Sequence, residues 1–407
     1  MTEAPILPAA NVSALKTLVL RYGLVLLVVA AITYGSLYPF VFSGRGSFAD
    51  DLLHLAGTWK ERPQSRGDLL QNLLLYLPLG VSAMLAFGRS GRKRTAAILA
   101  AGLGALLSLS IELAQFFDTE RVSSLSDFYL NVISTIGGVA VAWSGGVGWT
   151  KTTWPSGARA VFARLLLLAW PVWRLYPYVP TIDLHKYWHS VRPLIFEVGV
   201  SGYEVFRYTV IWLGMAFLLE TGFKPRRPAG LLAVVMLGVV AAKIMIVGQS
   251  LSREELLGMA LAFVISAMFL WRFRTAGIVG LALLLIGLVI SSRVLPWQLF
   301  PAQKSFQWIP FYGLLHGSLQ VDVISLAEKF TLYGTVILVL LAAGVPLWVA
   351  VLLESSLLFA TSWLQLYMPG RSAEITDAVL VLVLGFIYAL LRRQYPAAGK
   401  TAQPRTR

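Results

Sequence analysis

The residues best suited to chemistry lie between Glu112 and Asn131. Glu112 and Gln115 are three residues apart, and Asp127 and Asn131 are four apart, so each pair shares one face of a helix. Arg121 lies between the two pairs. A guanidinium can hold a phosphate or a carboxylate through two hydrogen bonds, and a carboxylate can act as a base. This stretch therefore predicts an anion-binding pocket, with Glu112 and Asp127 as the catalytic candidates if there is a reaction.

A second polar stripe precedes this stretch. Asp68, Asn72 and Tyr76 are spaced i, i+4, i+8, so they lie on one helix face and are expected to open at the same surface. Ionisable groups inside a membrane cost roughly 2.5–3.5 kcal/mol each on insertion scales and usually mark a site or a pathway. We therefore expect Asn72 to join Gln115, Arg121 and Asn131 in binding a substrate.

A structural interpretation explains the same residues. Asp127 suits the N-cap of a helix, where it also meets the favourable end of the helix dipole. Arg121 could pair with Asp127 or Glu112 only to close a loop. Asn72 and Asn131 could form hydrogen bonds between helices. The sequence leaves both interpretations open.

The composition identifies the elements that must position these residues. The 407 residues are 57% hydrophobic and 13% charged, with a mean hydropathy of +0.71, whereas soluble chains are about 25% charged. Segments of membrane-spanning length must be helical, because lipid offers no partner for a free backbone amide. The sequence predicts an all-α polytopic membrane protein with twelve transmembrane helices near residues 17–38, 68–87, 95–117, 127–145, 159–175, 203–220, 229–247, 254–271, 275–292, 324–342, 346–362 and 375–391.

The basic charge predicts the orientation of these helices. The formal net charge is +14. With the N-terminus in the cytoplasm, lysine and arginine are roughly threefold denser in the inner segments than in the outer ones, as the positive-inside rule requires. The charge is therefore a topology signal, and no nucleic acid is expected as a partner. Both termini are predicted to be cytoplasmic, which puts the polar cluster on the outer face.

Internal similarity indicates three four-helix repeats. A shift of 250 residues aligns Gln115, Arg121 and Asp127 with Gln365, Arg371 and Asp377, and a shift of 134 aligns Gln115 with Gln249. Four helices taken three times account for the twelve segments. The predicted domains are residues 1–150, a degenerate middle repeat at 151–274, a third repeat at 275–392 and a basic cytoplasmic tail at 393–407.

The same motif residues resemble a known family, the VanZ-like membrane proteins. The resemblance covers residues 20–145, and PGRSAEITD (369–377) is similar to the family's loop, which indicates a degenerate second copy near 295–392. It adds Arg371 and Asp377 as substrate-binding candidates. Two departures are Ser123-Ser124, where an acidic residue is common, and Val381 at the position of Asn131. The residues that carry the resemblance are Asn72, Pro78-Leu79-Gly80, Glu112, Gln115, Arg121, Asp127, Asn131 and Gly137-Gly138.

Other polar residues give weaker signals. His185 and His189 are four apart and could share a metal if that stretch is helical, but they also fit an aromatic belt at the membrane surface. Lys243 and Glu354 lie inside predicted helices and could pair, and Glu354 is the better functional candidate because it is in mid-helix. The chain contains no cysteine and no nucleotide-binding loop, so no metal and no cofactor are expected.

Three functions remain open. The first is a protein of the bacterial cytoplasmic membrane that acts at the outer face on a lipid or glycan precursor of the cell envelope, with membrane lipids and an anionic lipid-linked precursor as partners. The resemblance implies a link to resistance against the glycopeptide teicoplanin. The second is a transporter or flippase of such a precursor, since carriers are often built of repeats. The third is a non-catalytic partner of envelope enzymes, and whether the chain is an enzyme is left open.

Overall fold

The chain folds into two compact helical units, Met1–Thr153 and Trp154–Arg407. The computed structural model describes residues 9–42, 57, 66–88, 92–119, 123–148, 155, 157–196, 199–270, 274–301, 304–316 and 319–395. These residues form helices joined by loops, with isolated β-bridges and no β-strand among them. The predicted all-α class is confirmed.

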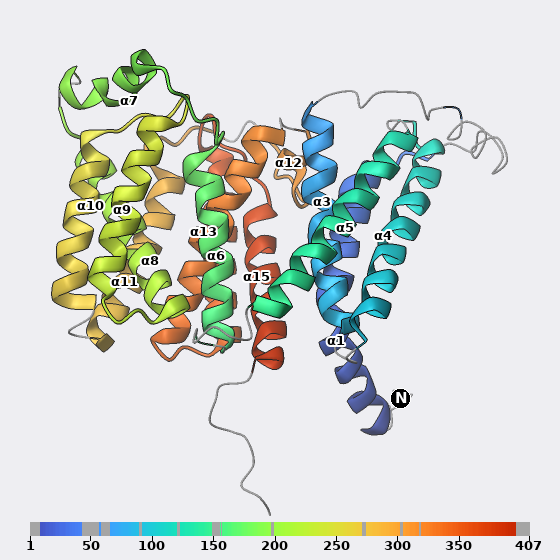
Figure 1. The fold of residues 1–407 in the computed structure, drawn as a ribbon. Coiled ribbons are helices and arrows are strands. Elements are labelled where there is room, and N and C mark those ends of the chain that lie inside the picture. Colours follow the sequence, from blue (N-terminus) through green and yellow to red (C-terminus); the bar gives the residue numbers. More distant parts are fainter. Residues whose placement is uncertain are drawn as a thin grey trace, which may run out of the picture. The chain divides into compact units, whose positions relative to one another are not determined.

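Four helices make up the first unit (Figure 1). Among the residues that the structure describes, these four are α1 (Ala9–Leu37), α3 (Arg66–Phe87), α4 (Lys93–Phe116) and α5 (Leu125–Gly148). The α3 helix packs along both α4 and α5, and α1 covers α3. Their shared core consists of small and aliphatic side chains around one buried ring, Tyr76.

Two glycines allow the backbones of α3 and α5 to touch. A Cβ atom on Gly80 would lie 2.0 Å from the carbonyl oxygen of Thr135, and one on Gly138 would lie 2.2 Å from that of Leu77. Small residues at such crossings let membrane helices approach closely. Packing therefore explains Gly80 and Gly138 of the motif.

The neighbouring glycines of α5 provide a matched test of this contact. Gly138→Ala should destabilise the first unit by about 1–3 kcal/mol, because the new methyl group meets backbone that cannot move aside. Gly137→Ala should be neutral or stabilising by up to about 1 kcal/mol, since no atom lies within 4 Å of its Cβ position and alanine favours a helix. Thermal unfolding of the two variants in detergent measures the difference, and equal stabilities would contradict the close contact.

The second unit contains the remaining helices. They are α6 (Ala158–Leu175), α7 (Leu184–Phe196), α8 (Gly202–Phe223), α9 (Pro228–Met245), α10 (Arg253–Ile265) with a π-helical turn η4 (Ser266–Leu270), α11 (Arg274–Val294), α12 (Tyr312–His316), α13 (Leu319–Ala342), α14 (Leu347–Leu364) with a 3₁₀ turn η5 (Gln365–Tyr367), and α15 (Thr376–Gln394).

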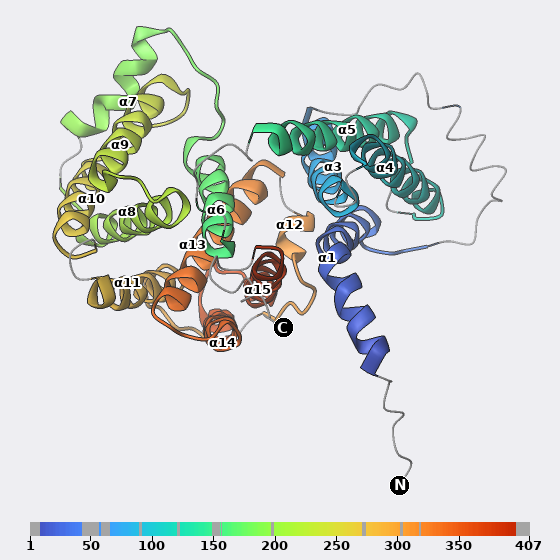
Figure 2. The same ribbon diagram turned by 60° about the horizontal axis from the view of Figure 1, so that its bottom comes forward.

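Helices α8 and α13 form the interior of the second unit. The end-on view shows α6 beside α13, with α14 and α15 next to them and α9 to α11 further out (Figure 2). In an 18-residue apolar window of α13, 56% of the residues are buried, against 22–33% for the other five long apolar helices that the structure describes. A continuous buried run, Thr209–Leu219, lies in α8. These two helices therefore face protein on nearly all sides.

The outer helices present apolar side chains outwards, as a membrane protein requires. Leu106 on α4, Leu237 on α9 and Leu283 on α11 are each at least 64% exposed, and Trp348 on α14 is 68% exposed. A water-soluble surface rarely carries apolar patches of this extent. The protein is therefore of membrane type.

Each of the twelve apolar segments predicted from the sequence coincides with a helix. Six helices of the described part are long and apolar enough to cross a membrane, and two shorter apolar helices lie at Tyr22–Leu37 and Leu75–Phe87. The count of twelve spans and the division into three repeats stay predictions. Of the predicted basic tail, residues 396–407 lie outside the described residues.

One predicted loop contains an unexpected helix. The stretch between the predicted transmembrane segments 159–175 and 203–220 contains a further helix, α7 (Leu184–Phe196), at the same end of the second unit as α12 (Figure 1). A search for long apolar blocks passes over it, because its 13 residues are too few to span a membrane and include His185, Lys186, His189 and Arg192. Leu184 and Trp188 are exposed beside His185 and His189. Such a helix suits a membrane surface rather than a span.

Candidate functional site

The polar cluster of the first unit centres on Glu112, near the end of α4. This carboxylate is 2% exposed, and its Oε2 accepts a hydrogen bond from the backbone N–H of Ser124 at 2.8 Å. Asp127, in the first turn of α5, lies within electrostatic reach of Glu112. The structure therefore brings together the two carboxyl groups singled out from the sequence.

A second layer of this cluster lies one to two turns deeper. Asn131 is 4% exposed and donates from Nδ2 to the Oγ of Ser108 at 3.0 Å, while its Oδ1 has no hydrogen-bond partner. The ring of Tyr76 is buried beside Ser108 and within electrostatic reach of Glu112. These groups come from α3, α4 and α5, so three helices converge on one polar region. The unpaired Oδ1 is a buried acceptor that a ligand donor could use.

Gln115 has a structural task. Its Nε2 donates to the backbone carbonyl of Ser36 at 2.8 Å and so joins the ends of α4 and α1. Two further glutamines make the same kind of bond in the second unit, where Gln249 donates to the carbonyl of Tyr176 and Gln365 to that of Arg293. These three glutamines, which we call the glutamine ties, each connect the first and third helices of one predicted repeat.

Two candidates of the first unit cannot be placed as side chains. Asn72 lies on α3, but its side chain is outside the described part of the structure, and Arg121 falls in the undescribed stretch 120–122. Their predicted roles in binding stay predictions. In the polar stripe of Asp68, Asn72 and Tyr76, only the side chain of Tyr76 is described.

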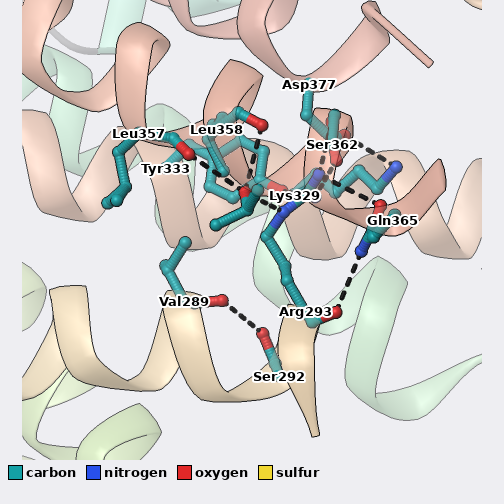
Figure 3. Close-up of polar contacts among 11 residues, drawn as sticks. Val289, Ser292, Arg293, Lys329, Tyr333, Leu357, Leu358, Ser362, Gln365 and Asp377 are labelled. Atoms are coloured by element: carbon teal, nitrogen blue, oxygen red, sulfur yellow. Dashed lines mark hydrogen bonds and ion pairs between the residues drawn. The ribbon is translucent and has the colours of Figure 1, made fainter. Parts of the chain in front are cut away.

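A buried ion cluster lies at the end of the second unit where α11 ends and α15 begins, which we call the loop end (Figure 3). Asp377, at the start of α15 and 3% exposed, pairs with Arg293 from α11, and its Oδ1 lies 2.7 Å from the Nζ of Lys329 on α13. Arg293 is 8% exposed and also donates from Nε to the Oγ1 of Thr361 at 2.7 Å and from Nη2 to Ser362 at 2.6 Å. We call Arg293, Lys329 and Asp377 the α15 ion cluster.

Arg371 is not part of that cluster. Its Nη2 donates to the carbonyl oxygen of Leu295 at 2.5 Å. The backbone carbonyl of Arg371 accepts a hydrogen bond from the Nζ of Lys304. Arg371 and Asp377 therefore have different partners. Of the two predicted binding residues in the third repeat, Asp377 is neutralised internally, whereas Arg371 lies partly exposed in a loop.

A similar ion cluster lies in the middle repeat. Glu255, in the first turn of α10 and 1% exposed, pairs with Arg174 from α6 and, at 2.5 Å, with the Nζ of Lys243 from α9. Arg174 also lies over the ring of Tyr208, 5.2 Å from its centre. We call Arg174, Lys243 and Glu255 the α10 ion cluster. Lys243 does not form the ion pair with Glu354 that the sequence allowed, because it lies near a helix end and meets Glu255 instead.

The sequence contained a signal for the arginines that the motif analysis missed. Arg174 and Arg293 each stand three residues before a proline, Pro177 and Pro296, at the end of the first helix of a repeat. The corresponding residue before Pro39 is Ser36. The first unit therefore lacks the arginine that the second unit has at both of its corresponding positions.

The histidine pair is positioned by α7. The Nε2 atoms of His185 and His189 are 3.2 Å apart, and both side chains are exposed. In the described part of the chain, no group of three or more potential metal ligands occurs. The pair therefore lacks the further ligands of a structural metal site.

The class of the first unit follows from its packing and its site. It is a four-helix membrane unit with a glycine-mediated α3–α5 contact and a buried pair of carboxyl groups at one end. Residues 22–146 match the family model VanZ/LLP1, so this segment is VanZ-like, as the motif residues indicated. No curated protein and no solved structure matched the chain.

Proposed function

We propose that the protein acts at the outer face of the bacterial cytoplasmic membrane on an anionic lipid-linked precursor of the cell envelope. The observation that carries this proposal is the position of Glu112, Asp127 and Asn131 within the VanZ-like segment. They meet at one end of the first unit, where a membrane-bound headgroup would lie. A polar group held at one membrane depth usually serves a site.

The difference between the repeats supports this choice of site. In the second unit, arginine and lysine side chains neutralise Glu255 and Asp377 from within the protein. In the first unit, Ser36 replaces the arginine at the end of the first helix. The end of the VanZ-like segment that holds Glu112 and Asp127 therefore has no equivalent of Arg174 or Arg293 at this position. The proposed role of Arg121 is to bind the anionic group of the ligand, and that of Glu112 or Asp127 is to orient the ligand or to take a proton.

A transporter or flippase is the second candidate, and one observation favours it. Glu354 is a buried carboxyl group in the middle of α14. Carriers place polar groups near the membrane midplane. In that case the ion clusters and Glu354 would line successive depths of one unit.

The proposed orientation can be tested by cysteine labelling, because the chain contains no native cysteine. Ser372 and Ala343 are exposed in loops at opposite ends of α14. An impermeant thiol reagent applied to intact cells should label Ser372→Cys and should label Ala343→Cys only after the membrane is permeabilised. The reverse pattern would place the termini outside and reject the outer-face proposal.

Ligand binding can be tested with a polyisoprenyl phosphate and the matched uncharged polyisoprenol. The purified protein should retain the phosphate lipid in native mass spectrometry and should not retain the alcohol. Arg121→Lys keeps the charge but loses the forked geometry of guanidinium, so binding should weaken. Arg121→Ala should weaken it further. Equal retention of both lipids would exclude recognition of the anionic group.

Glu112→Gln separates binding from chemistry in the first unit. Glutamine keeps the acceptor for the Ser124 N–H but cannot take a proton, so the fold should be preserved. If Glu112 is a base, activity should fall by about 10²–10⁴-fold, which is measurable as lost teicoplanin resistance in cells that express the protein. Glu374→Gln, a change near the loop end of the second unit, is the matched control. Unchanged resistance in Glu112→Gln would leave the cluster with a structural role only.

A further inference from the structure

Glu354 lies outside the VanZ-like segment and is the most anomalous polar residue of the second unit. It is 3% exposed, and neither carboxyl oxygen has a hydrogen-bond partner in the described structure. It stands ten residues before the end of α14, which places it about 15 Å from that end at the rise of an α-helix. That depth is the middle of a bilayer about 30 Å thick.

An ionised carboxylate is not stable in this environment. Its neighbours along the helix are the fully buried Ala350 and Leu358, and no salt bridge to Glu354 is formed by the described residues. Burying an isolated charge in an apolar interior is so costly that the group neutralises instead. A carboxyl group does so by binding a proton.

The helices packed on α14 carry a polar connection to this site. On α13, Tyr333 is 4% exposed and accepts a hydrogen bond from the Nη1 of Arg293 at 3.5 Å. Tyr333 lies within electrostatic reach of both Asp377 and Glu354. A hydrogen bond therefore joins Tyr333 to the α15 ion cluster, and an electrostatic interaction links Tyr333 to Glu354. Helices α11, α13 and α15 supply all of these groups except Glu354.

We propose that Glu354 is an exchangeable proton-binding site at the middle of the membrane, connected through Tyr333 to the α15 ion cluster at the loop end. The chemical class of the ligand is a proton rather than a metal cation, because a hard cation needs several oxygen ligands and none of the described side chains bonds to this carboxyl group. The second unit would then respond to the proton concentration on the side of the membrane where the α15 ion cluster lies.

The test uses dicyclohexylcarbodiimide, an apolar reagent that modifies protonated carboxyl groups in membranes. In the full-length protein in detergent, mass spectrometry of the peptide containing Glu354 should show modification that is lost as the pH is raised. Glu354→Gln should be unmodified and should retain the melting temperature of the parent protein, since an amide is as neutral as the protonated acid. Asp377 should remain unmodified because it is ion-paired.

A matched variant controls for access of the reagent. Leu353 is 58% exposed on the outer face of α14, so Leu353→Glu places a carboxyl group where the reagent must reach it. Modification of Leu353→Glu at the new residue without any modification at Glu354 would overturn the proposal. Labelling of Glu354 that does not change with pH would also overturn it, because the proton would then not exchange.

Two further results decide the ligand and the path. Protection of Glu354 by Na⁺ at constant pH would overturn the assignment to a proton and identify a metal cation. Tyr333→Phe removes only the hydroxyl group, so it should slow the change in labelling that follows a pH jump. An unchanged rate in Tyr333→Phe would overturn the proposed connection through Tyr333.

Discussion

Asp377→Asn is expected to lower the free energy of unfolding of the second unit by about 3–5 kcal/mol, the usual cost of removing one partner from a buried ion pair. Asparagine keeps the size of the side chain but removes the charge that two cations share. Arg293, which is 8% exposed, would remain buried with a full positive charge and only neutral partners. Chemical denaturation of the purified protein in detergent measures this loss.

The exposed ion pair of α8 provides the control. Glu204 lies 3.1 Å from Arg207, and the two side chains are 34% and 30% exposed. Exposed pairs contribute at most about 1 kcal/mol, so Glu204→Gln should change stability by less than that. If Asp377→Asn were no more harmful than Glu204→Gln, water would have to reach Arg293 in the folded protein.

The second large effect is expected in the α10 ion cluster. Glu255→Gln should also cost about 3–5 kcal/mol, because it leaves Arg174 and Lys243 facing each other without the carboxylate between them. Lys243→Met should cost much less, since the pair of Arg174 and Glu255 survives and methionine fills the space of the lysine stem. The same denaturation measurement compares the two variants. Equal losses would show that Lys243, rather than Arg174, neutralises Glu255.

Hydropathy was enough to find the helices, because a membrane helix must be apolar over its whole length. The apolar block at 203–220, for instance, corresponds to α8 (Gly202–Phe223). Hydropathy could not recognise α7, because its 13 residues are short and mix apolar with basic side chains. The π-helical turn at Ser266–Leu270 also lies inside an unbroken apolar block and leaves no trace in composition.

The candidate site was predicted unevenly, for a physical reason. Glu112 and Asp127 were identified because ionisable groups within membrane segments are rare, and the structure brings them within electrostatic reach of each other. Arg293 was missed because helix α11 continues past the apolar block and carries this residue into the protein interior. The partner of a buried charge depends on how distant helices pack. The sequence therefore indicated Asp377 but not the arginine that neutralises it.

The glutamine ties have a mechanical consequence. Each one holds two helices together at one end, because the glutamine donates a hydrogen bond to a backbone carbonyl at the end of another helix. The three glutamines are Gln115, Gln249 and Gln365. Separating those helices at that end would expose a broken amide–carbonyl bond in a region with little water, which is costly. We therefore expect each pair of tied helices to separate less readily at the tied end than at the opposite end.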